Sequence, residues 1–465
     1  MTTLSKARQL TTRLLPLLFP LLLAGLAWGQ SPTLSADSFG FQCGIGAQTN
    51  CPKETWPPTQ AQPGVLRLWD AGVSWGELNQ LNNQQGYSWT NLNKWLDAIA
   101  SHQPRQVIYT FGWTPCWDAT GGCGTRGSNY PPKDLGITTC TPNDSGSKSF
   151  CDFVTQLLQH CSPANNCVST YIQDFELWNE ANDSHYWGDG ATVGQLYQMM
   201  APAVAIIKQK IPAAKILTPP ISNAGGASGF QGWACSWLAE EVAHPISDIY
   251  AFHTYLQDNI PENQCCSPNS LAALQLAPNK TYSTTCSPQT GWSEHPWWVT
   301  ETNYNVGPNQ DSKYPWTCDL DKYTAADCAG QILRWQAIIN SNGGFNLTWY
   351  YWNTSIGEYN GNPQNENEIA YYWMMQYLNF GHFTAACSVG SGTTWTCPFA
   401  EVGGQSALFV WTTNDLIGHN YTLPVPNPYV DYRDLQGNTT KITPTETTVP
   451  ISAEPIMLET SLTTN

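Results

Sequence analysis

Short apolar runs alternate with longer stretches of helical periodicity up to about residue 381. Runs rich in β-branched and aromatic residues are typical of strands, whereas apolar residues three and four positions apart are typical of helices. The predicted strands cover residues 38–42, 64–70, 106–111, 171–177, 215–219, 248–255, 297–301 and 345–352. The predicted helices cover residues 88–102, 150–160, 193–210, 230–242, 329–340 and 369–380.

This alternation predicts an α/β fold. Strands separated by helices pair in parallel, and eight such units favour a closed (β/α)8 TIM barrel over residues 30–381. A doubly wound open sheet is the alternative. It is disfavoured because no glycine-rich phosphate loop follows an early strand.

The pattern changes from about residue 382. Helical periodicity disappears, and short β-rich runs are separated by turn residues. These runs cover residues 408–412, 421–425, 429–432 and 456–458, with a further one around Ile451. We therefore predict a small antiparallel, β-sandwich-like domain over residues 382–465.

The first 29 residues have the organisation of a secretory signal peptide. Three basic residues precede the apolar run 14–27, and the small residues Ala27 and Gly29 suit cleavage before Gln30. A membrane anchor is the alternative, but two prolines interrupt the run and it is short for a span. We expect a secreted protein, extracellular or periplasmic, that has no membrane association after cleavage.

The net charge of the chain limits the classes of partner that it can bind. The formal net charge is −16, and removal of residues 1–29, which hold three basic residues and no acidic ones, gives −16 − 3 = −19. Such a surface repels nucleic acid and anionic membranes. Neutral or cationic partners are therefore expected. Only 12% of the residues are charged, which suits an extracellular protein.

All 16 cysteines follow residue 29, as expected for an oxidising compartment. Pairs that are close in sequence predict local disulfide bonds at Cys43/Cys51, Cys116/Cys123, Cys140/Cys151, Cys161/Cys167, Cys318/Cys328 and Cys387/Cys397. The pairing of Cys235, Cys265, Cys266 and Cys286 stays open. A zinc site is the competing interpretation, but no CxxC pair occurs. We expect neither a metal ion nor a cofactor.

Two glutamates occupy matching positions, each closing an apolar run. Glu180 lies in the stretch YIQDFELWNEAN, and Glu301 lies in WWVTETN. Because all strands of a parallel barrel end at one face, the residues that close them converge there. The others at strand ends are Arg67, Trp69, Asp70, Trp113, Asn179, His253, Tyr255, Asn303 and Trp352.

This set predicts hydrolysis of a glycosidic bond, which needs a carboxylic acid and a second carboxylate. Arg67 and Tyr255 are expected to keep the second carboxylate ionised. Asn179 is expected to bind a sugar hydroxyl, and tryptophan rings offer flat faces to a pyranose. His253 is expected to contact either the substrate or another residue of the site, and not a metal. Glu176 is expected to be structural.

The sequence also resembles a known group of enzymes. The run 178–182, WNEAN, looks like the strand-four acid/base motif of clan A retaining glycoside hydrolases, and Thr300-Glu301 looks like their nucleophile. The runs RLWDAGVSW, YTFGWTP and FHTY resemble glycoside hydrolase family 39, the β-xylosidase and α-L-iduronidase group. The sequence departs from this pattern at Ala181, where the usual residue is proline, and in its cysteine-stapled loops.

The resemblance implies that Glu180 is the acid/base and Glu301 the nucleophile of a retaining enzyme. A plant-type polysaccharide or oligosaccharide is the implied substrate, with a β-xyloside or an arabinose-containing chain as the first choice. An endo-β-glucanase of another clan A family is the nearest alternative. A non-catalytic carbohydrate-binding protein on the same fold, or a disulfide-rich wall protein, are alternatives of a different class.

Overall fold

The computed structural model describes most of the chain, with gaps at both ends and in several loops. It describes residues 31, 33–42, 63–79, 86–141, 144–188, 190–222, 226–253, 262, 295–302, 305–306, 317–318, 325–349, 366–390, 392–401, 405–413 and 419–460. The predicted signal peptide lies outside this part of the chain. Among the described helices, none is both long enough and apolar enough to cross a membrane.

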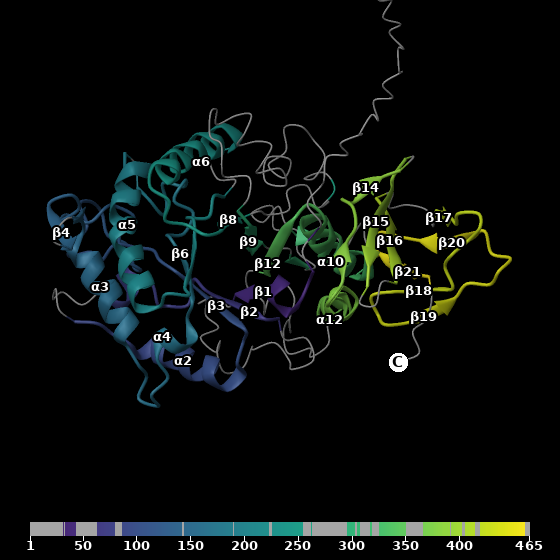
Figure 1. Ribbon diagram of the computed structural model, residues 1–465, viewed down its shortest axis with the longest axis horizontal. Helices are drawn as coiled ribbons and strands as arrows, with labels where there is room; N and C mark the ends of the chain where they lie inside the picture. The colour runs from purple at the N-terminus through teal and green to yellow at the C-terminus, as the bar shows by residue number, and fades with distance from the viewer. Residues whose placement is uncertain are drawn as a thin grey trace, which may run out of the picture.

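An eight-stranded parallel sheet forms the larger part of the molecule (Figure 1). Its strands are β1 (Phe39–Gln42), β2 (Val65–Leu68), β3 (Gln106–Thr110), β6 (Asp174–Glu176), β7 (Lys215–Leu217), β8 (Tyr250–His253), β9 (Trp297–Thr302) and β12 (Gly344–Trp349). Each lies inside or next to a strand that the sequence pattern predicts. Most of their residues are buried on both faces, as expected for parallel strands covered by helices.

The strand order is β7-β6-β3-β2-β1-β12-β9-β8. Along this order each strand lies next to its neighbour in sequence, and β1 pairs with β12, the last strand of the sheet. A doubly wound sheet would instead reverse its order at an interior strand. Two isolated parallel bridges, Leu217 to Ile249 and Ile221 to Phe252, lie between the β7 and β8 segments at the two ends of this order.

Helices cover the outside of this sheet, with α2, α3, α5 and α6 on the side away from the C-terminal domain (Figure 1). The helical segments are η1 (Ala36–Ser38), α1 (Trp75–Leu78), α2 (Thr90–His102), α3 (Lys148–Gln159), α4 (Val168–Tyr171), α5 (Val193–Lys210), α6 (Gly226–Ala243), α10 (Ala325–Ser341) and α12 (Glu366–Leu378). Thr192 and Gln195 form a capping box at the start of α5, where the sequence places a helix boundary.

Two small sheets come from loops that connect the larger elements. These are β4 (Thr138–Thr141) with β5 (Asp144–Gly146), and β10 (Asn305–Val306) with β11 (Thr317–Cys318). The residues around Tyr171 differ from the expectation. The sequence predicts a strand from residue 171, but residues 168–171 form α4 and the strand begins at Asp174. A short helical turn and a short strand share one apolar run here, which composition alone does not separate.

The C-terminal part is antiparallel. Its strands are β13 (His382–Phe383), β14 (Ser388–Val389), β15 (Thr394–Ala400), β16 (Ser406–Thr412), β17 (His419–Thr422), β18 (Asp431–Arg433), β19 (Thr439–Lys441), β20 (Thr448–Ile451) and β21 (Ile456–Glu459). They form a seven-stranded sheet and a two-stranded sheet of β17 and β20. The sequence pattern misses β13, β14, β15 and β19.

Strand β16 shows how the two parts are joined. Phe409 and Trp411 on one face of this strand belong to the main hydrophobic core, and Leu408 and Val410 on the other face belong to a small second core. The second core also includes Val449 and residues of the C-terminal strands, as in a sandwich. The main core therefore runs without a break from the parallel sheet into the C-terminal sheet.

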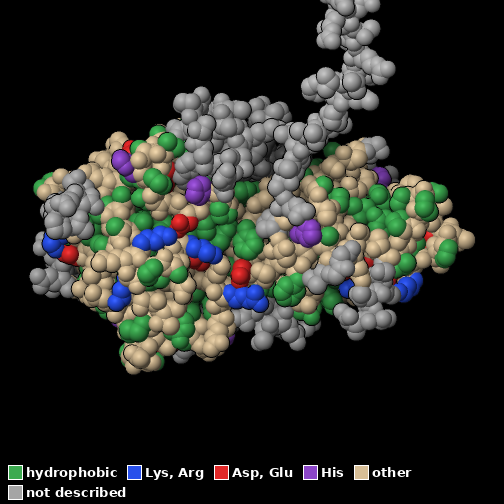
Figure 2. Space-filling view, in the orientation of Figure 1, with side chains coloured by type: hydrophobic (Ala, Val, Ile, Leu, Met, Phe, Trp, Pro, Cys, Tyr) green, Lys and Arg blue, Asp and Glu red, His purple; other side chains and the backbone are tan. Residues whose placement is uncertain are grey.

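Four of the predicted disulfide bonds are confirmed: Cys116–Cys123, Cys140–Cys151, Cys161–Cys167 and Cys387–Cys397. Cys235 is also disulfide-bonded. The predicted pair Cys43/Cys51 lies outside the described residues, as do Cys265, Cys266, Cys286 and the side chain of Cys328. Charged side chains are sparse on the face shown in Figure 2, in keeping with the composition.

Candidate active site

Polar side chains from five strands or their carboxyl ends meet at one end of the parallel sheet. Gln42, Arg67, Glu176, His253 and Glu301 lie at or next to the ends of β1, β2, β6, β8 and β9, and each of these side chains is buried. Parallel strands bring their carboxyl ends to one edge, which explains why residues so distant in sequence gather there. Asn179 and Glu180 follow β6 directly and are buried beside them.

Arg67 links most of these groups. Its Nη1 donates to Glu301 Oε2 at 2.6 Å and to Gln42 Oε1 at 2.8 Å. Its Nε and Nη2 donate to Glu176 Oε2 at 2.9 and 2.5 Å, and Nη2 also donates to Asn179 Oδ1 at 2.8 Å. The guanidinium is 1% exposed. Its planar set of donors therefore fixes two carboxylates and two amides without help from water.

Glu180 has a different partner. Its Oε1 lies 2.8 Å from Nδ1 of His253, and the same nitrogen lies 4.0 Å from Glu301 Oε2. Ligand atoms of Glu180, His253 and Glu301 all lie within 4.8 Å of one another. The two glutamates thus face each other across a small space, with Arg67 on the Glu301 side and His253 between them.

The surroundings of the two glutamates favour different protonation states for them. Burial raises the pKa of Glu180 well above its usual range, the charge of Glu301 raises it further, and Arg67 opposes the shift. Burial, with the charge of Arg67, lowers the pKa of His253 well below its usual range. Both shifts favour the neutral forms of the two side chains, so the contact between His253 and Glu180 is favoured as a hydrogen bond rather than an ion pair. Glu301, held by Arg67, is the group whose negative charge is stabilised.

The backbone is strained where the site is built. Seven described non-glycine residues have positive φ, and four of them, Asp70, Trp113, Trp178 and Glu180, lie just after β2, β3 or β6. Left-handed backbone costs an L-residue about 1–2 kcal/mol. Such strain gathers at functional sites, where the rest of the fold holds it in place.

An aromatic wall stands beside the glutamates. The rings of Trp69 and Trp113 are stacked with centroids 6.4 Å apart, and Tyr186 packs against both at 5.8 and 5.5 Å. Burial raises the pKa of the Tyr186 hydroxyl, and the charges of Glu180 and Glu301 raise it further. The hydroxyl therefore stays protonated and lies within the electrostatic reach of both carboxylates.

Four buried donors in this region have no acceptor among the described residues. They are Nδ2 of Asn179, Nε1 of Trp113, Nε2 of Gln42 and Nη2 of Arg126. A buried donor without a partner costs about 1–3 kcal/mol. An acceptor that arrives with a ligand, such as a hydroxyl oxygen, would satisfy them.

The structure brings together eight of the eleven site residues that the sequence predicts. Glu180, Glu301, Asn179, Arg67 and His253 are in mutual contact, while Trp69, Asp70 and Trp113 are in or next to the aromatic wall. Tyr255, Asn303 and Trp352 lie outside the described residues. Glu176, expected to be structural, is bound by Arg67 and by Thr110 Oγ1.

Sequence reasoning missed three residues that contact the site. Gln42 closes the first strand, so the rule that selects strand ends would have found it. Tyr186 and Arg126 lie in loops after β6 and β3, and no periodicity or motif marks them. Only the folded structure places them beside the aromatic wall.

Glu180, His253 and Glu301 also have the ligand types of a metal site. The position of Arg67 opposes this use, because its guanidinium lies 2.6 Å from Glu301 Oε2 and repels a second cation. The arrangement suits acid and nucleophile chemistry better, since that chemistry needs one protonated and one ionised carboxyl group side by side.

Comparisons with known proteins agree with the fold. No family model and no curated protein matches the sequence. A glucosidase from Croceicoccus marinus is 13% identical with a TM-score of 0.52, the match covering 93% of this chain and 96% of that chain. CelM2, a bifunctional glucanase-xylanase from a metagenome library, is 11% identical with a TM-score of 0.55, covering 93% and 97%. The catalytic domain of GH30 xylanase C from Talaromyces cellulolyticus is 12% identical with a TM-score of 0.56, covering 92% and 97%.

These matches span both the parallel sheet and the antiparallel C-terminal part. The chain therefore has the fold of known glycoside hydrolases, as the sequence resemblance implied at the level of the clan. Identities of 10–13% in these and similar structures show the fold and leave the reaction to the residues of the site.

Proposed function

We propose that the protein is a retaining glycoside hydrolase in which Glu180 is the acid/base and Glu301 the nucleophile. One observation carries the proposal: two buried carboxyl groups face each other with oxygens within 4.8 Å, one favoured as the neutral acid and the other held by an arginine. Retaining enzymes place their two carboxyl groups about 5–5.5 Å apart, whereas inverting enzymes leave room for a water between them.

In the first step, the carboxylate of Glu301 attacks the anomeric carbon while the bond from that carbon to the leaving oxygen breaks. Glu180 gives its proton to the leaving oxygen, so the departing sugar or aglycone leaves as a neutral alcohol. Arg67 holds Glu301 in place and in its ionised form before the attack.

In the second step, water attacks the anomeric carbon and releases Glu301. Glu180, now ionised, takes a proton from this water and returns to its starting state. Two inversions at the same carbon restore the original anomeric configuration. The hydrogen bond between Glu180 and His253 keeps the carboxyl group aimed at the reacting bond through both steps.

Asn179 and the aromatic wall are proposed to bind the sugar. Asn179 Oδ1 accepts from Arg67, which fixes the amide so that Nδ2 remains as a donor. A hydroxyl next to the reacting carbon is the acceptor that this geometry suits. Trp69 and Trp113 supply apolar surface for the C–H face of the ring.

We infer further that the parallel sheet closes into a (β/α)8 barrel over residues 30–381, with residues 382–465 as a β domain that shares its core. The bridges between the β7 and β8 segments support closure. The substrate proposed first is a β-xyloside or an arabinose-containing chain, as the family 39 resemblance implies; a β-glucan is the alternative. Similar structures described as a xylanase and as a glucanase-xylanase are compatible with both. Secretion remains part of the proposal, supported by the disulfide bonds.

The deciding experiment incubates the protein without residues 1–29 with xylan, arabinan, β-glucans and the matching aryl glycosides. Products are followed by NMR from the earliest time points, with Glu180→Gln as the control. Retention of the anomeric configuration, and loss of polysaccharide cleavage in the control, would support the proposal. An inverted first product would rule out Glu301 as the nucleophile.

The competing function is carbohydrate binding without catalysis. It would be favoured by saturable binding of an oligosaccharide with no turnover of any aryl glycoside. Its weakness is that mere binding has no need for one carboxyl group with a raised pKa next to one stabilised as an anion.

A further inference from the structure

Arg126 is held beside the aromatic wall by two kinds of contact, with aromatic rings and with carboxylates. Its guanidinium lies 5.2 Å from the ring centroid of Trp69 and 5.7 Å from that of Trp113. Its Nε donates to Glu77 Oε1 at 2.7 Å, and its Nη1 pairs with Asp70. One side chain thus connects residues that follow β2, residues that follow β3, and helix α1.

The loop that carries Arg126 is fixed in turn. Thr114 and Ser128 exchange two backbone hydrogen bonds, of 2.8 and 2.7 Å, which close the loop directly after Trp113. The Cys116–Cys123 disulfide bond lies within it. Trp113 directly precedes this closed loop, and Arg126 lies near its other end. The positions of the two side chains are therefore coupled through the loop.

Three glycines leave the space that the two tryptophans occupy. A Cβ atom at Gly112 would lie 2.5 Å from the Trp69 ring, and one at Gly76 or Gly127 would lie 2.9 Å from Trp113 Cβ. Gly127 also has a φ of +133°, which L side chains rarely adopt. The close packing shows that the position of the wall is specified by the sequence around it.

Helix α1 provides the anchor for this arrangement. Glu77 accepts from the backbone and side chain of Ser74 at the helix start, while its other oxygen accepts from Arg126. The side chains of Asp70 and Glu77 are only 11% and 14% exposed, so little water reaches their carboxylates. The ion pairs with Arg126 stabilise their negative charges instead. The positive charge of Arg126 is matched by these two partners, and it is therefore poorly suited to bind an anionic substrate.

We propose that Arg126 is a positioning residue for sugar binding, which holds Trp69, Trp113 and Asp70 in the arrangement that the substrate meets. This inference rests on the proposed function in that it takes the aromatic wall to be the sugar-binding side of the site. Arg126 acts through the wall and takes no part in the proton transfers. Its loss should therefore weaken binding much more than it slows the chemical steps.

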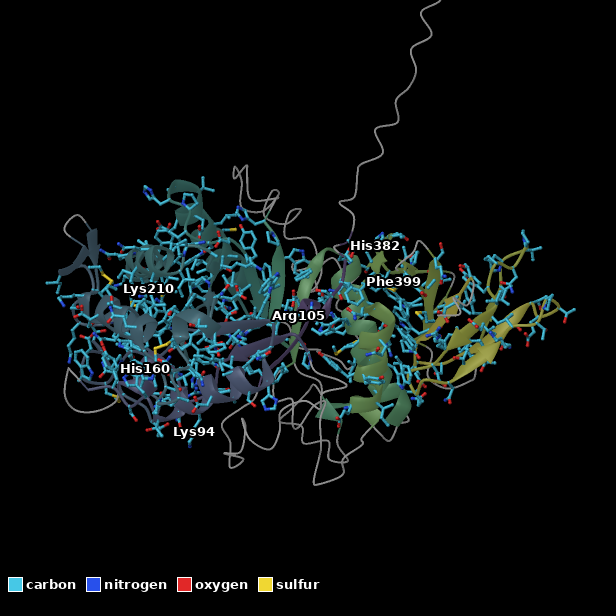
Figure 3. The ribbon with its side chains drawn as sticks, turned by 60° about the horizontal axis from the view of Figure 1, so that its bottom comes forward. Lys94, Arg105, His160, Lys210, His382 and Phe399 are labelled. Atoms are coloured by element: carbon cyan, nitrogen blue, oxygen red, sulfur yellow. A yellow bond between two sulfur atoms is a disulfide. The ribbon has the colours of Figure 1, made fainter. Side chains whose placement is uncertain are left out.

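The test measures binding in a background that cannot turn over. Xylotetraose and cellotetraose are titrated into the Glu180→Gln protein and into the same protein with Arg126→Ala, Arg126→Lys or Arg105→Ala added. Binding is followed by tryptophan fluorescence and calorimetry. Arg105 is the matched control because it is exposed and lies just before the opposite, amino end of β3 (Figure 3).

We expect the Kd of the tetrasaccharide that binds to rise roughly tenfold with Arg126→Ala and to stay unchanged with Arg105→Ala. Arg126→Lys keeps a charge for Asp70 and Glu77 but loses the planar fork and its stacking, so an intermediate rise at an unchanged Tm is expected. With Glu180 intact, Arg126→Lys should raise KM for the hydrolysed aryl glycoside and leave kcat within about twofold.

The inference would be overturned if both Arg126 variants bind as the parent does, or if weaker binding only tracks a fall in Tm. A fall in kcat as large as the rise in KM would also contradict the inference, because it would indicate a general defect of the site. If the wild-type protein binds a tetrasaccharide but hydrolyses nothing, the proposed function fails and the binding comparison still decides the role of Arg126. If the parent binds neither sugar, the inference about Arg126 is overturned, whereas the proposed function is decided separately by the hydrolysis of arabinan, xylan, β-glucans and the aryl glycosides.

Discussion

Nη1 of Arg67 lies 2.6 Å from Oε2 of Glu301, although 234 residues separate the two in sequence. The same guanidinium is buried and is held by Glu176 and Asn179. Because these hydrogen bonds hold the guanidinium in place, its position does not depend on solvent or on bound substrate. It gives one of two neighbouring glutamates a permanent counter-ion and leaves the other, Glu180, to be governed by burial and by its neighbour's charge.

The first prediction concerns the pH profile of hydrolysis. Glu180 must be protonated in the first step, and its raised pKa keeps it protonated above the usual titration range of a glutamic acid. Activity should therefore fall on the alkaline side as pH passes the pKa of Glu180. Glu180→Gln should reduce kcat on unactivated substrates by roughly 10²- to 10⁴-fold.

A substrate with a good leaving group provides the control. Dinitrophenyl glycosides need no proton from Glu180 to form the glycosyl-enzyme, so the alkaline limb should disappear when this step is followed in Glu180→Gln. An alkaline limb that persists unchanged in the variant would mean that another group titrates there.

A second prediction separates the roles of the two glutamates by chemical rescue. Glu301→Ala should abolish turnover, and added azide should restore cleavage of an activated glycoside to give a glycosyl azide of inverted configuration. Glu180→Ala with azide should give the retained product, because Glu301 still forms the intermediate. NMR of the anomeric proton distinguishes the two, and the reverse pairing of products would exchange the assigned roles.

The third prediction is that Arg67 stabilises the fold as well as the site. Arg67→Met removes the counter-ion of buried Glu176 and Glu301, and such a loss typically costs about 3–5 kcal/mol in the free energy of unfolding. Urea denaturation at neutral pH measures this cost. Thr110→Val is a suitable comparison because it removes one hydrogen bond to Glu176 and leaves the charges in place. A cost no larger than for this variant would contradict the interpretation.

A fourth prediction concerns the pH dependence of stability. The pKa of Glu454 is raised from 4.5 to about 7, mainly by burial. Since the folded state holds this proton more tightly than the unfolded state, stability is lost as pH rises from about 4.5 to about 7. Glu454→Gln should therefore have the wild-type Tm below this range and a higher Tm above it. Calorimetry across the range tests this, and a constant difference in Tm would exclude it.

The fifth prediction concerns the buried ion pair of Arg334 in α10 with Glu262, a glutamate that also accepts a hydrogen bond from the C-terminal sheet. Nε of Arg334 donates to Glu262 Oε1 at 2.6 Å, and Nε1 of Trp411 in β16 donates to the same oxygen at 2.6 Å. Glu262→Ala removes the carboxylate that pairs with the buried Arg334, so the free energy of unfolding should fall by several kcal/mol. Far-ultraviolet and near-ultraviolet circular dichroism should still report one shared transition. Separate transitions would show that the two parts unfold independently.

The sequence predicts the framework of this protein because the framework depends on periodicity. Eight strands and the long helices each carry a pattern that local sequence determines, and Glu180 and Glu301 stand at ends of such strands. Short elements such as α4 and β19 carry too few residues for a period to appear. They are set by tertiary contacts instead.

Charge states and loop contacts could not be predicted in the same way. That Arg67 binds Glu176 as well as Glu301 depends on which side chains face inward from β2, β6 and β9. Tyr186 and Arg126 reach the site from loops whose path no periodic pattern describes. The contacts of Arg67 favour Glu301 as the ionised group and burial favours Glu180 as the acid, the roles that the sequence resemblance implied without giving their physical cause.

The continuous hydrophobic core described above limits how the chain can be shortened. Phe383, Phe399 and Phe409 pack on one another and belong to the same core as Tyr371 of α12, and Phe399 lies at the junction of the two parts (Figure 3). A protein ending at residue 381 would uncover this aromatic surface to water. The C-terminal sheet is therefore not an interchangeable attachment. A shortened version of this protein should therefore keep the C-terminal sheet and lose residues only from surface loops.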